Sequence, residues 1–410
     1  MDEKREVLLS VRNLQQYFKM GRKINKAVDG ISFDIYKGEV FGLVGESGCG
    51  KTTTGRSIIR LYDITGGSVY FKGHRICAGI NTYKEAIAAA RRDCERRIAE
   101  LGKNADPAGI AALRSERDSF IRRQQEEIKL ARYDQKYCNK QYSKNEVERV
   151  KAGYEAKLAA VSGSEREALS QKMEHEIMLA RSDRITNKIQ MIFQDPIASL
   201  DPRMTVREII AEGLIIRGVH DRKYIDEQVY RVLDLVGLVP EHAGRYPHEF
   251  SGGQRQRIGI ARAIILRPDL IIADEPISAL DVSIQAQVIN LLNELRNSLG
   301  LTILFIAHDL SVVKYFSDRI AVMYFGKIVE LADSDELFRH PLHPYTKSLL
   351  SAIPLPDPHS EKRRQRLIYN PIAEHDYSVD GPSLREISPG HFVSCNDAEY
   401  AAYRKVIENG

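Results

Sequence analysis

The stretch from Gly45 to Thr53, GESGCGKTT, constrains the fold of this chain more than any other. A glycine, four residues, a second glycine, a lysine and a threonine follow one another in it. An apolar run at 40–44 precedes the stretch, and helix-forming sequence continues from 54. A buried strand, a glycine-rich loop and a helix in this order are the context of a phosphate-binding loop in an α/β fold. The alternative is a glycine turn that happens to precede Lys-Thr.

The residue types of this loop suit a nucleotide phosphate chain. Its glycines let backbone N–H groups point inward, and the following helix adds the partial positive charge of its N-terminus. Lys51 is expected to reach the β- and γ-phosphates, the Thr52 hydroxyl to ligate magnesium, and Thr53 to hold a phosphate oxygen nearby. We assign the whole loop to nucleotide binding: Gly45, Glu46, Ser47, Gly48, Cys49, Gly50, Lys51, Thr52 and Thr53.

Composition places the chain among soluble proteins with more than one structural unit. It has 410 residues, 43% of them hydrophobic and 28% charged, and a net charge of +4 gives no strong case for nucleic acid as a partner. No apolar run approaches the roughly 18 residues of a membrane span, and the charged N-terminus lacks the apolar core of a secretory signal. The five cysteines have no paired spacing, which predicts reduced cytosolic thiols and neither a disulfide framework nor a zinc site.

Polar side chains follow three apolar runs that are predicted to be strands. Asp274 and Glu275 come after 270–273, His308 after 301–307, and Gln194 after 189–193. The carboxyl ends of parallel strands meet at one edge of a sheet, so these groups should gather beside the phosphate loop.

Phosphoryl transfer needs positioning and charge neutralisation more than covalent chemistry. We therefore expect Asp274 to hold magnesium, directly or through water, and Glu275 to polarise the attacking water. His308 should contact the γ-phosphate, and Gln194 should sense magnesium and water. Taken singly, each residue has an ordinary reading as a solvated acid or a structural side chain, so the prediction rests on the ordered set.

Ser251-Gly252-Gly253-Gln254 resembles the signature of the ATP-binding cassette (ABC) ATPases. The phosphate loop, Gln194, this signature, Asp274-Glu275, the segment 278–281 and His308 occur in the order of that family. The resemblance covers roughly 5–75 and 188–330. It implies an α/β P-loop NTPase cassette with a RecA-like core, a β subdomain and an α-helical signature subdomain at about 196–265. One departure is Phe250, where the family usually has leucine.

The same resemblance assigns further nucleotide contacts and implies ATP and Mg²⁺ as cofactors. Phe18 would stack on the adenine ring, although alone it would read as a core aromatic. The signature, Ser251, Gly252, Gly253 and Gln254, would meet the γ-phosphate of an ATP held by a second cassette. Asp281 would belong to the same nucleotide-binding set. Two cassettes would then enclose two ATP molecules head to tail.

A finer resemblance points to the oligopeptide and dipeptide importer ATPases. It rests on 190–196, on 199–204, on the tail segment 340–350, and on 382–386 and 389–393. It implies a peripheral subunit at the cytoplasmic face of the cell membrane that powers peptide import. Its partners would be a second, non-identical ABC ATPase subunit, two membrane permease subunits and an extracytoplasmic peptide-binding protein. Some members bind an iron–sulfur cluster through tail cysteines, but only Cys395 is present here, so no cluster is expected.

Two other functions stay open on the sequence. Nickel and other small-solute importers use similar ATPases. Non-transport ABC ATPases that act on nucleic acid also interrupt the cassette with coiled coil, but their insertion follows the glutamine loop, whereas here it precedes Gln194.

The insertion is a charged, nearly proline-free stretch that the usual family pattern lacks. We place it at 76–187, between the cassette segments 1–75 and 188–330. The C-terminal region at 331–410 is richer in proline, and we expect it to be a less regular tail. An apolar stripe from Tyr83 to Leu101, a helix start at Asp106-Pro107, and capping-box patterns at 143–146 and 164–167 predict three or four helices. They should form a folded-back arm, either a tolerated helical decoration or a docking or regulatory arm.

Overall fold

The computed structural model describes residues 5–101, 106–353, 366–378 and 380–409. The chain forms two compact units. The core unit comprises Met1–Val7, Ile35–Ile59 and Asn187–Gly410. The second unit comprises Leu8–Asp34 and Arg60–Thr186. We call it the arm unit because it contains nearly all of the predicted arm at 76–187, although it also includes strands that precede the arm.

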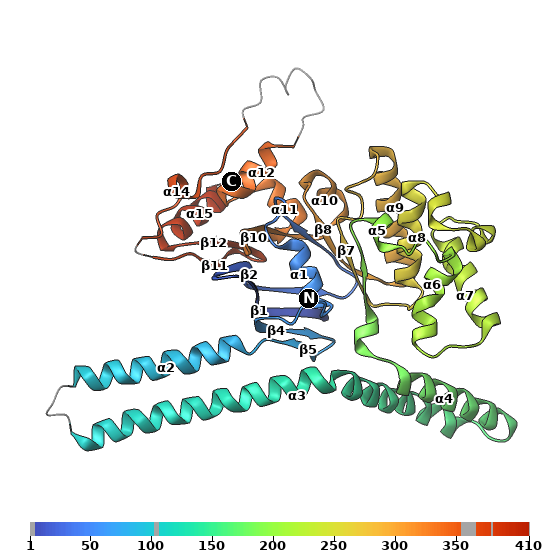
Figure 1. Cartoon of the computed structure of the whole chain (residues 1–410), viewed down its shortest axis with the longest axis horizontal. Helices are drawn as coiled ribbons and strands as arrows, with labels where there is room; N and C mark the ends of the chain where they lie inside the picture. Colours follow the sequence, from blue (N-terminus) through green and yellow to red (C-terminus); the bar gives the residue numbers. More distant parts are fainter. Residues whose placement is uncertain (1–4, 102–105, 354–365, 379, 410) are drawn as a thin grey trace. The chain divides into compact units, whose positions relative to one another are not determined.

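An eight-stranded sheet organises the core unit, in the order β11-β12-β10-β9-β3-β8-β7-β6. The strands from β6 to β9 in this order are parallel, and β10, β12 and β11 continue the sheet in antiparallel pairs. Figure 1 shows helices on both faces of this sheet. The strands are β3 Val40–Val44, β6 Ile189–Ile192, β7 Leu270–Asp274, β8 Thr302–Ala307, β9 Arg319–Tyr324, β10 Lys327–Asp333, β11 Ser383–Ser388 and β12 His391–Cys395.

The helices of the core unit alternate with its strands along most of the chain. This alternation is the pattern that produces parallel strands with helical crossovers. The helices are α1 Lys51–Ile58, α5 Pro196–Ser199, α6 Val206–Ile216, α7 Arg222–Leu235, α8 Gly252–Ile264, α9 Val282–Leu299, α10 Leu310–Phe316, α11 Ser334–Arg339, α12 Pro344–Ser351, α14 Pro371–Glu374 and α15 Asp397–Asn409, with short 3₁₀ turns at Ile185–Lys188, Pro240–Gly244 and Pro247–Glu249.

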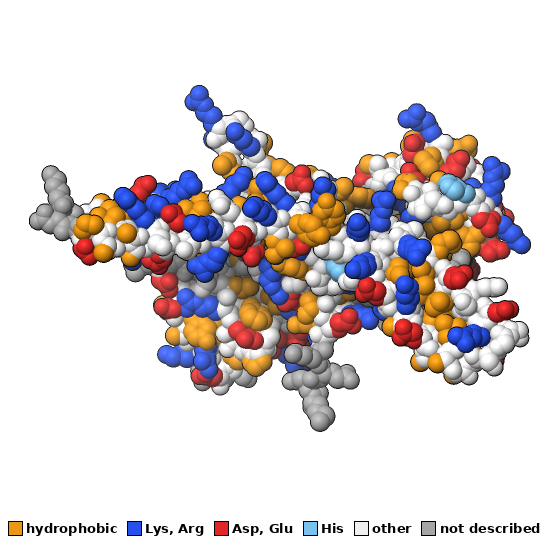
Figure 2. Space-filling view, turned by 90° about the horizontal axis from the view of Figure 1, so that it is seen from below, with side chains coloured by type: hydrophobic (Ala, Val, Ile, Leu, Met, Phe, Trp, Pro, Cys, Tyr) orange, Lys and Arg blue, Asp and Glu red, His pale blue; other side chains and the backbone are white. Residues whose placement is uncertain are grey.

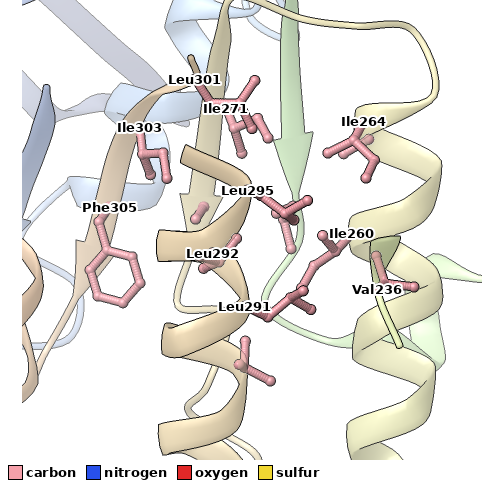
Figure 3. Close-up of a cluster of buried hydrophobic side chains, with 14 of the residues drawn as sticks. Val236, Ile260, Ile264, Ile271, Leu291, Leu292, Leu295, Leu301, Ile303 and Phe305 are labelled. Atoms are coloured by element: carbon pink, nitrogen blue, oxygen red, sulfur yellow. The ribbon is translucent and has the colours of Figure 1, made fainter. Parts of the chain in front are cut away.

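The central strands are apolar along their whole length because helices cover both of their faces. Every residue of β3, β7 and β8 is buried. On one face, Leu291, Leu292 and Leu295 of α9 pack beside Ile271 and Phe305 of the strands (Figure 3). Burying a leucine or isoleucine side chain contributes about 1.5–3 kcal/mol, so this layer holds the strand ends, and the polar groups that follow them, in fixed positions.

The C-terminal region is more regular than its proline content suggested. The tail is not irregular, because two of its segments form strands of the main sheet: β12 pairs with β10, and β11 pairs with β12. The fully buried carboxylate of Glu330 accepts hydrogen bonds from the amides of Leu342 and His343 and lies 2.9 Å from Nε2 of His391. These long-range contacts tie the tail to the sheet, and no local sequence pattern could have shown them.

The arm unit contains a four-stranded antiparallel sheet and three long helices. The strand order is β2-β1-β4-β5. In Figure 1, α2 and α4 each lie alongside a different half of the long helix α3. The elements are β1 Val7–Met20, β2 Lys23–Tyr36, β4 Gly66–Phe71, β5 His74–Ala78, α2 Asn81–Glu100, α3 Pro107–Ala160 and α4 Ser164–Ser182.

One predicted helix boundary in the arm is wrong. The pattern at 143–146 was expected to cap a new helix, but α3 runs unbroken through it for 54 residues. No proline interrupts this stretch after the first position, and lysine, arginine, glutamate and glutamine favour a continuous helix. Ser143 donates instead to the carbonyls of Ala180 and Arg181, which ties α3 to the end of α4.

The other helix starts are as predicted, with one change of cap. The side chain of Asp106 accepts a hydrogen bond from the Ala108 amide, and Pro107 occupies the first helical turn. Helix α4 begins at Ser164, but its N-cap is Gly163 and no side chain caps it. The segment 102–105, where the first predicted helix should have ended before Asp106, lies outside the described residues. Within the described part of the chain, no helix is both long and apolar enough to span a bilayer.

Candidate nucleotide site

The phosphate loop connects β3 to α1 at the centre of the core-unit sheet. Gly45, Gly48 and Gly50 all have positive φ values, of 152°, 81° and 109°. Gly45 has a second requirement, because a Cβ there would lie 2.1 Å from the carbonyl oxygen of Met323. The glycines expected from the sequence are therefore needed for the backbone path of the loop.

Lys51 lies inside the curve of this loop. Its side chain is 4% exposed, and Nζ donates to the carbonyl of Gly45 at 2.7 Å and to that of Glu46 at 2.9 Å. A buried ammonium held by carbonyl oxygens offers a charge-assisted contact for phosphate oxygens. The predicted position of Lys51 at the phosphate site is thus consistent with its surroundings.

Thr52 and Asp274 meet although 222 positions separate them. The Thr52 hydroxyl donates to Oδ1 of Asp274 at 2.8 Å. Asp274 is fully buried at the end of β7, and its second oxygen, Oδ2, has no hydrogen-bond partner among the described residues. Burial raises the pKa of Asp274, although the Thr52 hydrogen bond and nearby Arg56 oppose the shift. A hydroxyl and an unpartnered carboxylate oxygen are ligand types that Mg²⁺ prefers.

Glu275, Gln194 and His308 converge on one another at the carboxyl edge of the sheet. Nε2 of Gln194 donates to Oε2 of Glu275 at 3.1 Å, and Nδ1 of His308 lies 3.1 Å from the same oxygen. The Glu275 side chain is 12% exposed and that of His308 is 53% exposed. These residues follow β7, β6 and β8, which are neighbours in the sheet, so the strand order brings the predicted set together.

Glu275 occupies a backbone conformation that non-glycine residues rarely adopt. Its φ is 45°, and such a residue costs of order 1–3 kcal/mol unless its surroundings fix it. The Glu275 amide donates to the carbonyl of Ile306, and the Ser278 hydroxyl donates to the carbonyl of Glu275. The neighbouring strand and the following turn therefore aim this carboxylate at the cluster.

The signature forms the exposed N-terminus of α8. Ser251 is the N-cap: its hydroxyl accepts from the Gln254 amide, and the Gln254 side chain accepts from the Ser251 amide. A Cβ on Gly253 would approach Ile284 to 2.6 Å, so close packing against α9 requires a glycine there. Among the described residues, neither the signature nor Asp281, the N-cap of α9, hydrogen-bonds to the phosphate loop.

Phe18 lies in the arm unit, near the end of β1. Its ring is half-buried and meets Tyr62 edge to face, with centroids 5.3 Å apart. The expected contact with adenine stays a prediction.

A group that sequence analysis missed holds the outer side of the phosphate loop. The Glu46 amide donates to the hydroxyl of Tyr345 at 3.0 Å, and the Gly326 amide donates to the carbonyl of Cys49 at 2.9 Å. Tyr345 belongs to the tail segment 340–350, which resembles the tail of the importer ATPases and gives no sign of a contact with the loop. Its place against the loop depends on the tertiary structure.

Comparison with known proteins agrees with this geometry. The ABC transporter family model matches residues 28–182 and 158–278, and the model for the oligopeptide/dipeptide transporter C-terminal region matches residues 329–379. This chain belongs to the ABC transporter family. It is an ABC-type, ATP-binding transport ATPase, as the ordered motifs predicted.

The similar proteins extend over nearly the full chain. The oligopeptide transport ATP-binding protein OppF of Bacillus subtilis is 46% identical over 399 residues, covering 97% of this chain and 99% of the relative. The dipeptide transport ATP-binding protein DppF of Lactococcus lactis is 42% identical over 411 residues, covering 99% of each. CbiO1 of Clostridium perfringens, part of an ABC transporter complex, shares the fold with a TM-score of 0.50 at 19% identity, covering 82% of this chain and 91% of the other.

Proposed function

We propose that this ATPase powers the import of oligopeptides or dipeptides from the cytoplasmic face of the cell membrane. The observation that carries the chemistry is the convergence of Gln194 and His308 on the Glu275 carboxylate, in the unit that also contains the Thr52–Asp274 pair. The similarity to OppF and DppF supports a peptide as the transported solute.

The chain's own residues divide the hydrolytic work. Lys51 and the loop amides hold the phosphates, while Glu275 orients the attacking water and accepts its proton. His308 contacts the γ-phosphate, and Gln194 would link the position of the water to a bound Mg²⁺. Thr52 and the free oxygen of Asp274 would hold Mg²⁺, which would neutralise phosphate charge when bound.

The remaining nucleotide-binding residues of this chain lie outside the phosphate loop. The exposed N-terminus of α8 is free to meet an ATP on a second cassette, with Ser251 to Gln254 supplying amides and Asp281 lying nearby in that interface. Phe18 would stack on adenine.

We propose a second, non-identical ABC ATPase, two permeases and an extracytoplasmic peptide-binding protein as the partners.

Within the chain, we propose a cassette at 1–75 and 188–330, an inserted arm at 76–187 and a C-terminal region at 331–410. The unbroken α3 and its two flanking helices support the arm assignment.

Lys and Arg side chains are interspersed with Asp and Glu over the face seen in Figure 2, which does not favour nucleic acid as a partner.

The deciding experiment is peptide-stimulated ATP hydrolysis in the reconstituted transporter. Short peptides with the binding protein should raise the hydrolysis rate and be taken up, whereas Ni²⁺ should do neither. Stimulation by Ni²⁺ alone would assign the chain to a nickel importer, and stimulation by DNA would assign it to the non-transport class.

Affinity capture of the native complex tests the partners separately. Two kinds of ATPase subunit in equal amounts are expected beside two permeases. Recovery of this chain as the sole ATPase subunit would mean that its cassettes form a homodimer.

A further inference from the structure

We propose that Tyr345 is a positioning residue for ATP binding, through which the C-terminal region sets the conformation of the phosphate loop. The proposal rests on the peptide group between Gly45 and Glu46. The N–H of this group donates to the Tyr345 hydroxyl at 3.0 Å, and its carbonyl accepts from Lys51 Nζ at 2.7 Å.

A single rigid plane therefore connects the tyrosine to the phosphate-binding lysine. Because a peptide group is planar, fixing the direction of its N–H also fixes the direction of its C=O. The Tyr345 hydroxyl thus determines where one of the two carbonyls that hold Lys51 points. Rotation of this plane would move the Gly45 carbonyl away from Lys51 and reshape the start of the loop.

Tyr345 is itself held firmly. It is 2% exposed, and its amide donates to Nδ1 of His343, the N-cap of α12. Its ring lies against those of Tyr324 and Tyr369, with centroids 4.4 Å and 5.5 Å away. Burial also raises the pKa of Tyr345, so the phenol stays protonated and neutral. Its oxygen can therefore act as a fixed acceptor for the loop amide.

The C-terminal region supplies the anchor for this arrangement. The amides of Leu342 and His343, just before α12, both donate to the buried carboxylate of Glu330 on β10. The hairpin that ends β9 adds a second clamp, from the Gly326 amide to the Cys49 carbonyl. The outer side of the loop is thus fixed at Glu46 by α12 and at Cys49 by the hairpin.

The test compares Tyr345→Phe with Tyr369→Phe in the full-length chain. Tyr369 belongs to the same aromatic cluster, but among the described residues its hydroxyl makes no hydrogen bond to the phosphate loop, so it is a matched control. ATP affinity is measured by calorimetry and thermal stability by unfolding without nucleotide.

Tyr345→Phe should weaken ATP binding about two- to tenfold, the range expected for losing one neutral hydrogen bond. Tyr369→Phe should bind ATP like the wild type. In the assembled ATPase, Tyr345→Phe should raise KM for ATP and leave kcat nearly unchanged, because Glu275 is untouched. A lower melting temperature with unchanged ATP affinity would overturn the proposal and leave Tyr345 a purely structural role.

Amide hydrogen exchange in the wild-type protein gives a second test that needs no variant. The Glu46 amide should be protected without nucleotide, since it donates a hydrogen bond to the Tyr345 hydroxyl. Exchange of this amide at the rate of an unprotected loop would overturn the proposal even if Tyr345→Phe failed to fold. Wild-type ATP binding in the same preparation separates this result from a failure of the nucleotide-site assignment.

Discussion

Replacing Glu275 by glutamine should stop ATP hydrolysis while ATP still binds. The change keeps the size of the side chain and removes its charge and its basicity. In the native protein, one carboxylate oxygen lies 3.1 Å from both Gln194 and His308. The glutamine amide can still accept or donate one of these contacts, so the loss should fall on the chemistry and not on the fold.

The magnitude follows from the role of a general base. Proton transfer by a positioned side chain contributes typically about 10²- to 10⁴-fold, and each factor of ten corresponds to about 1.4 kcal/mol of activation free energy. Glu275→Gln should therefore slow hydrolysis at least about 100-fold, or about 3 kcal/mol. The phosphates are held by Lys51 and the loop amides, so ATP affinity should stay within about threefold of the wild type.

The rate is measured as phosphate release by the assembled transporter, and affinity by ATP binding to the purified subunit. Glu294→Gln is the matched control, because it makes the same chemical change on the exposed side of α9. The control should hydrolyse ATP like the wild type. Hydrolysis by Glu275→Gln at more than about a tenth of the wild-type rate would refute the assignment of the base, given the factor expected from it.

Three further variants test other parts of the site and the arm. Lys51→Ala should weaken ATP binding at least about tenfold, as expected for losing a charge-assisted contact, and calorimetry measures this; unchanged affinity would remove Lys51 from the phosphate site. Asp274→Asn should abolish Mg²⁺-dependent hydrolysis yet raise the melting temperature at pH 7. Burial raises the pKa of Asp274, so its contribution to stability is full below the ordinary value of 3.8 and is lost as the pH rises through the folded-state pKa. The gain in melting temperature should shrink as the pH is lowered, and a lower melting temperature at pH 7 would contradict this reasoning. Replacing residues 78–186 with a short Gly-Ser linker should leave ATP binding intact, checked by calorimetry on a variant with native circular dichroism; lost binding would place the arm in the active site, and retained hydrolysis with lost peptide uptake would make it a coupling element.

Local pattern predicted the phosphate loop and the buried strands of the core, and the order of the motifs gave the resemblance to the ABC ATPases. The glycines at 45, 48 and 50 predict a backbone conformation that only glycine adopts readily, and all three have positive φ values. Apolar runs such as 270–273 predict strands buried on both faces, which β7 is. The carboxyl ends of parallel strands meet at one edge of the sheet. The polar residues at or just after these ends are therefore candidates for the nucleotide site: Gln194, Asp274, Glu275 and His308.

Local pattern failed where a long-range contact competes with it. The serine at 143 fits a helix cap, yet it bonds to the end of α4 while α3 continues past it. The tail is predicted to be irregular because its prolines and short apolar runs do not show that β12 pairs with β10 and β11 with β12. Both errors arise because the deciding partner lies tens of residues away in the chain.

The sequence by itself determined the phosphate loop and the candidate groups for hydrolysis, since these depend on residue types at fixed local spacings, and the order of its motifs along the chain gave the resemblance to the family. Only the tertiary structure decided that Thr52 bonds to Asp274, that Gln194 and His308 share one oxygen of Glu275, and that Tyr345 holds the loop from outside. The physical reason is that hydrogen bonds between distant segments follow from strand order and helix packing, and these are set by burial of the whole core.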